Sequence, residues 1–167
     1  MDHEWPDWVA SGTSGPSRVP WVPEALDDLQ HTGCRMSISS SGDRRVAQQR
    51  RELHLTNFFE EVYDSAVVGS SMPDPHIVEL ALSDLDLDAG EALYVGDLSY
   101  TDVWGANRAG MGAVHPDLLG LYGGWPGVHL EDVRQLVGWL PGYVAAPESN
   151  DVRPLSGFTL QPEQRPG

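Results

Sequence analysis

One short stretch, residues 92–102, constrains the fold of this chain more than any other. Residues 92–95 form a continuous apolar run, Ala-Leu-Tyr-Val, bounded by polar residues, which predicts a strand covered on both faces. Residues 103–109 then predict a short helix that Gly110 closes. A buried strand followed at once by a helix is typical of a parallel sheet, because parallel strands need a crossover connection.

The rest of the chain repeats this succession of strand and helix. The sequence predicts strands at 36–39, 62–68 and 112–114, and helices at 23–32, 44–53, about 74–85 and 131–140. In the third helix, Ile77, Leu80, Ala81 and Leu85 are expected to face inward. The alternation predicts an α/β fold: a three-layer parallel sheet with helices on both faces.

A chain of 167 residues suits one domain of ordinary size. Residues 1–20 are rich in small residues and have no period, so we expect a flexible arm. Residues 21–144 carry the predicted α/β domain. Residues 145–167 revert to Pro, Ser, Asn and Gln, which predicts a disordered tail.

The charge balance limits the partners of the protein. Ten basic residues, all of them arginine, stand against 25 acidic ones, so the formal net charge is −15. Such a field repels phosphate backbones and anionic membranes, and we expect no nucleic-acid or membrane partner. No apolar run approaches the roughly 20 residues that cross a bilayer. With the single cysteine Cys34 the chain forms no internal disulfide, and we expect a cytoplasmic location.

Two polar stretches follow predicted strands, at 40–43 and 96–102. Ligands bind beyond the carboxyl ends of strands in such sheets. Asp97 and Asp102 flank a strand-to-helix turn, where both carboxylates can face a hard cation such as Mg²⁺. The alternative is that Asp102 only caps the following helix while Asp97 is solvated.

These segments resemble the haloacid dehalogenase-like hydrolase superfamily, in its phosphatase branch, from about Trp21 to Trp139. Residues 94–102 and 105–111, Gly-Ala-Asn-Arg-Ala-Gly-Met, are similar to the family's fourth motif and the helix after it. Residues 55–69 are similar to the stretch that leads to the third motif, and 33–43 to the second. The resemblance implies metal ligation by Asp97 and Asp102 and phosphate binding by Ser40 and Ser41, although a capping role for Ser40 explains it equally well.

Two departures from the family decide the expected activity. The family's third motif has Lys-Pro-Asp-Pro, whereas this chain has Met72 before Pro-Asp-Pro, so the lysine position is degenerate and no lysine exists elsewhere. The family also begins with a strand ending in Asp-x-Asp-x-Thr, whose first aspartate attacks phosphorus. No such motif precedes Gly33. The chain therefore resembles the carboxyl-terminal core portion of the family, without the nucleophile motif or a cap.

The absent motif also has a consequence for the sheet. In the family its strand is central, so the predicted sheet is incomplete, with two half-sheets and open edges. Three fillers remain open: direct pairing of the flanking strands, which ranks above a strand at Arg18–Val22 because of Pro20, or a second protein chain. We expect a protein partner or homodimer to cover the open edge.

The sequence thus predicts a phosphate-monoester hydrolase by resemblance, with weak or vestigial Mg²⁺ binding and little or no activity in isolation. A small phosphorylated metabolite is the expected substrate if the protein is active. The alternatives are a non-catalytic binding or regulatory protein, or a truncated gene product. The six histidines show no ligand spacing, and His115 in the loop after the last predicted strand supports only a weak link to the site.

Overall fold

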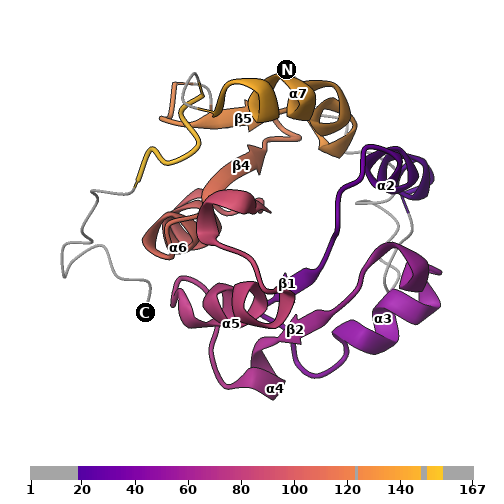
Figure 1. Cartoon of the computed structure of the whole chain (residues 1–167). Coiled ribbons are helices and arrows are strands. Elements are labelled where there is room, and N and C mark those ends of the chain that lie inside the picture. The colour runs from indigo at the N-terminus through magenta and orange to yellow at the C-terminus, as the bar shows by residue number, and fades with distance from the viewer. Residues whose placement is uncertain (1–18, 123, 148–149, 156–167) are drawn as a thin grey trace.

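The computed structural model describes residues 19–122, 124–147 and 150–155. Within these ranges five short strands form two parallel sheets (Figure 1). The first sheet pairs β1 (Ile38–Ser40) with β2 (Val62–Asp64). The second has the order β3 (Leu93–Val95), β4 (Gly112–Pro116) and β5 (Val128–Leu130). Parallel strands joined through helices confirm the predicted α/β class.

Helices lie between β1 and β2, between β2 and β3, and between β3 and β4, whereas β4 leads to β5 without a helix in the described residues. The helices are α2 (Val22–His31), α3 (Val46–Glu52), α4 (Ser65–Val68), α5 (His76–Leu85), α6 (Trp104–Arg108) and α7 (Val133–Ala145). Single 3₁₀ turns lie at Thr56–Phe58 and Ala89–Glu91, and a π-helical turn, η3, covers Ser99–Val103. None of the helices in the described ranges is long and apolar enough to cross a membrane.

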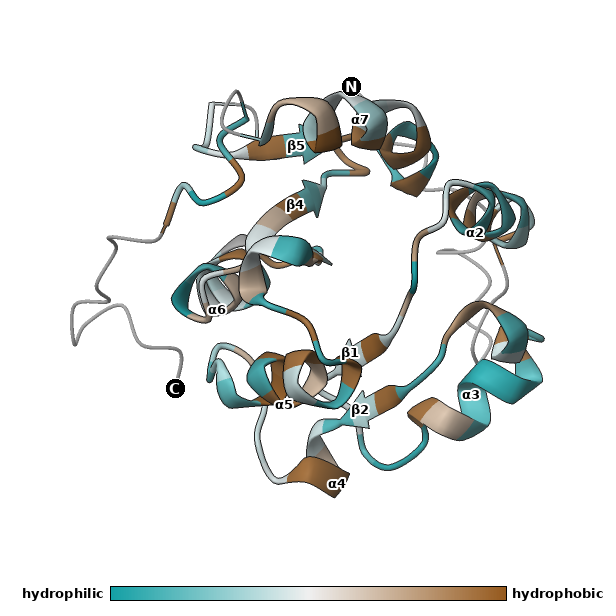
Figure 2. Cartoon of the chain, in the orientation of Figure 1, coloured by the Kyte–Doolittle hydropathy of each residue, from teal (hydrophilic) through white to brown (hydrophobic). Residues whose placement is uncertain are grey.

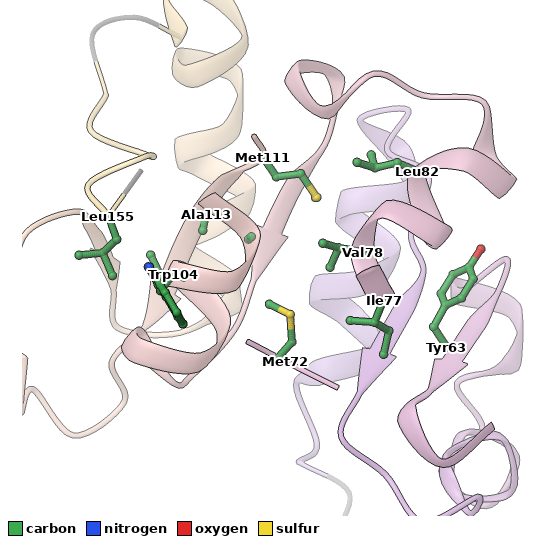
Figure 3. Close-up of a cluster of buried hydrophobic side chains, with 11 residues drawn as sticks. Tyr63, Met72, Ile77, Val78, Leu82, Trp104, Met111, Ala113 and Leu155 are labelled. Carbon is green, nitrogen blue, oxygen red and sulfur yellow. The ribbon is translucent and has the colours of Figure 1, made fainter. Parts of the chain in front are cut away.

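The helices cover opposite faces of the sheets. Side chains of neighbouring strand residues point to opposite faces, and Leu93 and Tyr94 pack into two different apolar clusters. One cluster gathers α5 and α6 side chains around Tyr63 and Ala113, and Figure 3 shows its members. The other joins α2 to α7. The first cluster contains Tyr63 of one sheet and Tyr94 and Ala113 of the other, so side-chain packing rather than a continuous ladder joins the two sheets.

Hydropathy follows this arrangement. In Figure 2 the brown segments of α2, α5 and α7 alternate with teal ones along each helix. In α5 the buried residues are Ile77, Val78 and Leu82, while Leu80 is only partly buried. The helix therefore faces the core with a stripe slightly rotated from the predicted one.

The predicted strand at 62–68 is shorter than expected. β2 ends at Asp64, and residues 65–68 form α4. The Asp64 side chain causes the change, because its Oδ1 accepts the Ala66 N–H at 3.0 Å and caps the helix. Gly69 then ends α4 with a φ of 77°, a backbone conformation that favours glycine.

Part of the expected disordered tail is packed. Val152 and Leu155 are buried, and the Val152 carbonyl accepts the Ala113 N–H of β4 at 2.7 Å. Asn107 holds the same segment: its Nδ2 donates to the Val152 carbonyl at 3.1 Å, and its Oδ1 accepts the Leu155 N–H at 3.0 Å. The prediction thus differs from the structure over 150–155, while 156–167 lie outside the described residues.

The structure also differs from two of the three fillers considered for the sheet. β1 pairs with β2 and β3 pairs with β4, and the strand ladders of the described residues contain no β1–β3 pair. Direct pairing of the flanking strands is therefore wrong. A strand at Arg18–Val22 is not formed either, since residues 20–21 lie in a turn and Val22 begins α2, with Pro23 in its first turn. Arg18 and the rest of the predicted arm up to it lie outside the described residues.

Candidate active site at the carboxyl end of β3

Asp97 lies directly beyond β3, as the sequence predicts, with its side chain exposed. The backbone at this residue is fixed by His115 of β4, whose Nε2 lies 2.9 Å from the Asp97 carbonyl oxygen. A carbonyl only accepts, so this histidine nitrogen carries the proton and donates. His115 is only 2% exposed, so β4 holds the loop that presents Asp97.

Asp102 returns toward Asp97 through the π-helical turn η3. Its Oδ2 accepts the Leu98 N–H at 3.1 Å, and Gly96 lies so close to its side chain that a Cβ there would meet the carboxylate carbon at 2.7 Å. A π-helical turn is rare and is frequent at functional sites. Here it brings the second carboxylate back over the end of β3.

Burial raises the pKa of the Asp102 carboxyl above its usual value, and the charge of Asp97 raises it further. The Leu98 N–H and His115 act in the opposite direction. Because the charge of one carboxylate acts on the other, the structure brings the two predicted metal ligands together. The alternative that Asp102 caps the helix at Val103 is not observed. Asp102 Oδ2 accepts the Leu98 N–H, and α6 has no side-chain cap.

Tyr94 is a member of this site that the sequence analysis did not single out. Burial, followed by the charge of Asp102, raises the pKa of its phenol to about 12, and Asp97 adds to the effect. The nearby Ser39 side chain of β1 lowers the pKa of Tyr94 and so opposes the shift. Ser39 Oγ itself is buried and makes no hydrogen bond within the described residues. Tyr94 thus lies between the two carboxylates of the second sheet and the first sheet. Its position at the centre of the apolar run gave no sequence signal.

A second group surrounds His115, which the sequence linked only weakly to the site and placed in a loop, whereas it lies within β4. The sequence analysis did not single out its neighbours. Nδ1 of His115 lies 3.0 Å from Nδ1 of His129 on β5, and Nε2 of His129 lies 3.1 Å from the Trp125 carbonyl. Tyr122 packs edge-on against His115 with ring centroids 4.5 Å apart. These contacts tie the loop after β4 to the loop that carries Asp97. The two histidines stand 14 positions apart, so only the pairing of β4 with β5 reveals them.

The predicted phosphate-binding serines lie on the other sheet. Ser40 is the last residue of β1, half-buried beside Asp64 of β2, and Ser41 follows it in an exposed position. Among the hydrogen bonds and ion pairs of the described residues, none joins Ser40 or Ser41 to Asp97 or Asp102. Their role as phosphate ligands therefore stays a prediction.

Met72 is part of the hydrophobic core. It is 8% exposed, and in Figure 3 its side chain lies between Trp104 and Ile77. A Cβ placed on Gly105 of α6 would meet Met72 Cε at 2.7 Å, so the thioether fills the space beside this glycine. Where the family's third motif has a lysine, this chain therefore has an apolar side chain that packs in the core.

The family comparison agrees with this geometry. The model of the family described as "Haloacid dehalogenase-like hydrolase" matches residues 11–115. The chain belongs to this family. The match includes both strands of the first sheet, the loop of Met72 and the loop of Asp97 and Asp102.

Several curated relatives are phosphatases. The chain is 34% identical over 119 residues to glyceraldehyde 3-phosphate phosphatase of Pyrococcus abyssi, covering 65% of this chain and 50% of that protein. It is 33% identical to phosphoglycolate phosphatase of Pseudomonas savastanoi pv. phaseolicola, covering 57% of this chain and 35% of that protein. The chain therefore spans about half the length, or less, of these relatives.

Solved structures show the same fold. A phosphatase of this family from Thermococcus onnurineus superimposes with a TM-score of 0.69 at 28% identity, covering 74% of this chain and 58% of that chain. A 2-haloacid dehalogenase from Pseudomonas syringae pv. tomato superimposes with a TM-score of 0.65 at 27% identity, covering 74% and 53%. The fold thus accommodates both phosphatases and dehalogenases.

The residues of this candidate site suit a hard cation in their chemistry. Mg²⁺ is commonly bound through one or two carboxylates, with water and substrate oxygens completing its octahedron. Asp97 and Asp102 supply two carboxylates whose mutual repulsion a cation would relieve. In the described part of the chain, no group of three or more His, Cys, Asp or Glu side chains is placed to hold a metal ion, so protein ligands alone do not complete a site.

Proposed function

We propose that this chain carries the metal-binding part of a phosphate-monoester hydrolase site and turns over little or no substrate by itself. The observation that carries the proposal is the pair Asp97 and Asp102 at the carboxyl end of β3. The charge of Asp97 raises the pKa of Asp102, and both carboxylates act on the phenol of Tyr94. Family membership makes the chain a hydrolase by resemblance. The curated relatives named above support a small phosphorylated metabolite as the substrate class.

The position of the aspartates supports the low activity. Ahead of Gly33, the described aspartates are Asp27 and Asp28, both on the helix α2 rather than at the end of a strand. Asp2 and Asp7 lie outside the described residues. A carboxylate nucleophile would have to meet the phosphorus beside Asp97. α2 packs against α7 in an apolar cluster that includes no residue of the loop of Asp97 and Asp102.

The replacement of the lysine by Met72 supports it further. Phosphoryl transfer depends on cations that neutralise the developing charge. Met72 carries no charge and packs in the core. Arg108 is no substitute, since its guanidinium lies over the Trp104 ring at 4.9 Å and donates to the Pro73 carbonyl.

Within this proposal, Asp97 and Asp102 would hold a Mg²⁺ ion, which when bound supplies charge neutralisation for a phosphate ester. A magnesium-bound structure of Bacillus subtilis YfnB shares the fold, with a TM-score of 0.63. The chain's own groups have distinct roles. His115 fixes the backbone of Asp97, and the Leu98 N–H orients the Asp102 carboxylate. Tyr94 keeps its proton at neutral pH and presents an uncharged hydroxyl.

An assay of the full chain tests both parts of this proposal. The purified protein is incubated with Mg²⁺ and p-nitrophenyl phosphate, and Mg²⁺ binding is followed by calorimetry. We expect the parent chain to bind Mg²⁺, Asp97→Asn to remove this binding, and the exposed Asp28→Asn to leave it intact. We expect the parent chain to hydrolyse the ester no faster than either variant does. Turnover that disappears in Asp97→Asn would overturn the low activity, and binding unaffected by Asp97→Asn would overturn the metal site.

A second candidate function, a non-catalytic binding or regulatory protein, is favoured by the surface around the same site. Large apolar side chains are exposed at the end of β3 and in the segments after β3 and β4: Val95, Leu98, Tyr100, Leu118, Leu119, Leu121 and Trp125. Tyr100 and Trp125 join the two loops edge-to-face, with ring centroids 5.0 Å apart. Exposed apolar patches of this kind mark interaction surfaces. A stable complex in size-exclusion measurements supports this function, whereas a monomer without a partner contradicts it.

A further inference from the structure

Two histidines on neighbouring strands face each other with the same ring nitrogen. β4 and β5 are parallel and pair His115 directly with His129, so both side chains project from the same face of the sheet. Their Nδ1 atoms lie 3.0 Å apart, and their ring planes are inclined at 81°. Figure 1 shows the two strands side by side, with α7 next to β5.

The backbone contacts of these two rings determine which nitrogens carry protons. Nε2 of His115 lies 2.9 Å from the Asp97 carbonyl oxygen, and Nε2 of His129 lies 3.1 Å from the Trp125 carbonyl oxygen. A carbonyl oxygen only accepts, so both Nε2 atoms donate. A neutral imidazole has a single N–H, which leaves a lone pair on each Nδ1. Two lone pairs at 3.0 Å repel each other unless a positive charge lies between them.

The same pattern of hydrogen bonds is typical of histidines that bind metal ions. A metal-binding imidazole almost always donates its other ring N–H to a carboxylate, a backbone carbonyl or water, which fixes the tautomer and the orientation of the ring. Metal–nitrogen bonds are about 2.0 to 2.1 Å long, so two nitrogens 3.0 Å apart subtend roughly 95° at the ion, close to the right angle of octahedral coordination. The separation of the two Nδ1 atoms therefore suits one shared ion.

We propose that Nδ1 of His115 and Nδ1 of His129 together bind one divalent transition-metal ion of the Zn²⁺ and Co²⁺ class, at a site separate from the carboxylates of Asp97 and Asp102. Imidazole nitrogen suits these ions, whereas Mg²⁺ prefers oxygen ligands. In the described part of the chain no third His, Cys, Asp or Glu side chain joins the two histidines in a metal-binding group, so water completes the coordination. The inference does not depend on the proposed hydrolase function.

The surroundings of the two histidines favour a positive ion. Asp117 follows His115 by two positions, and its carboxylate oxygens accept the N–H groups of Leu121 and Tyr122 at 2.9 Å each. The Tyr122 ring packs edge-on against His115, so the loop that holds this carboxylate lies against the pair. Negative charge nearby attracts a cation. His115 is buried and His129 is only half-buried, so we expect the ion to enter from the β5 side.

Calorimetry with ZnCl₂ on the full chain tests the site, with Mg²⁺ in excess to compete for oxygen ligands. We expect the parent chain to bind Zn²⁺ under these conditions. His129→Gln keeps an amide N–H for the Trp125 carbonyl and removes Nδ1, so it should weaken Zn²⁺ binding by about tenfold or more. The exposed His76→Gln is the matched control. Asp97→Asn keeps the backbone carbonyl that accepts from His115, and both of these variants should bind Zn²⁺ as the parent chain does.

Long-range ¹H–¹⁵N NMR spectra of the parent chain identify the liganding nitrogens without any variant. On addition of Zn²⁺ we expect the ¹⁵N shifts of Nδ1 to change in both His115 and His129, while both Nε2 atoms keep their protons. Circular dichroism of His129→Gln shows whether that variant folds.

Three results would overturn the inference. Absence of Zn²⁺ binding would show that a shared proton, rather than a metal ion, joins the two rings. Unchanged Zn²⁺ affinity in a folded His129→Gln chain would place the ion elsewhere. Loss of Zn²⁺ binding in Asp97→Asn would place the ion at the carboxylates, whereas loss of Mg²⁺ binding in the same variant bears only on the proposed function.

Discussion

Met72 contributes to the packing of the core at the position where the family's third motif has a charged lysine. Its side chain lies in the core beside Gly105 and is 8% exposed. Restoring a lysine at this position would place an ammonium group among Trp104 and Ile77 (Figure 3). Burying an unpaired charge in such apolar surroundings destabilises the folded state.

We therefore expect Met72→Lys to lower the free energy of unfolding by about 2 kcal/mol or more and to add no phosphatase activity. Met72→Leu keeps the volume and the apolar character, and should cost less than about 1.5 kcal/mol. Urea denaturation compares the two variants with the parent chain. Equal stability of Met72→Lys and Met72→Leu would show that the side chain at this position reaches solvent.

Asp102 allows a prediction on pH. Its carboxyl has a pKa above the ordinary value in the folded protein, chiefly because of burial. The folded state therefore holds a proton here more tightly than the unfolded state does, so stability falls as the pH rises from the unfolded pKa, about 4, through the raised folded pKa. Asp102→Asn removes this loss and keeps an acceptor for Leu98.

The expected result is a stability difference between Asp102→Asn and the parent chain that shifts in favour of the variant between about pH 4 and pH 7. Chemical denaturation at both pH values measures it, and Asp28→Asn on the exposed face of α2 serves as the control. A difference that shifts toward the parent chain as the pH rises would mean that the charged form of Asp102 is stabilised. Added Mg²⁺ should reduce the advantage of the variant, since it binds the ionised pair.

At the scale of elements, the sequence predicted the helices and strands that local pattern determines. Gly33 and Gly110 follow their helices as expected, with φ of 88° and 83°, and the strand at 92–95 and the turn with both aspartates are where the sequence placed them. β5 (Val128–Leu130) was missed, because three residues including a histidine carry no period and only β4 pairs with them. The contribution of Tyr94 and His115 to the site depends on contacts between elements, which spacing along the chain does not encode.

Asn107 links such distant elements, and a conservative change tests its role. The buried amide donates to the carbonyls of Met111 and Val152 and accepts from Leu155. Asn107→Asp keeps the shape but replaces the donor by an acceptor. The Met111 and Val152 carbonyls then lose the hydrogen bond from the amide, Val152 keeps only the bond from Ala113, and a charge is buried. We expect a loss of about 2 to 4 kcal/mol and release of the segment 150–155.

Hydrogen exchange at the Ala113 amide, which donates to Val152, reports the release directly. Limited proteolysis of the carboxyl-terminal residues gives a second readout. The control is Asn150→Asp, since Asn150 makes one long contact, 3.3 Å, with the Ala146 carbonyl. Unchanged protection of Ala113 in Asn107→Asp would show that Val152 and Leu155 hold the segment by apolar packing without the amide.

At the scale of the whole molecule, charge acts on a fold whose two sheets are joined by helices. The chain carries 25 acidic and 10 basic residues. The ion pairs of the described residues between arginines and acids, Arg35–Glu60, Arg45–Asp43 and Arg134–Asp132, all have an arginine more than half exposed or close to it. Asp132 is the one buried carboxylate among these three pairs. Exposed pairs contribute little, so we expect repulsion among the excess carboxylates to dominate the electrostatics of folding.

Salt should therefore stabilise this protein. Raising NaCl from about 20 mM to about 500 mM shortens the screening length from roughly 20 Å to roughly 4 Å and weakens the repulsion, so we expect the melting temperature to rise. Asp86 gives a matched variant, because it ends α5 with a φ of 54°, a conformation that asparagine also adopts. Asp86→Asn should raise the melting temperature at low salt, since it removes a negative charge from a helix carboxyl terminus, and should raise it less at high salt. A melting temperature that falls with NaCl in the parent chain would show instead that the three ion pairs outweigh the excess of carboxylates.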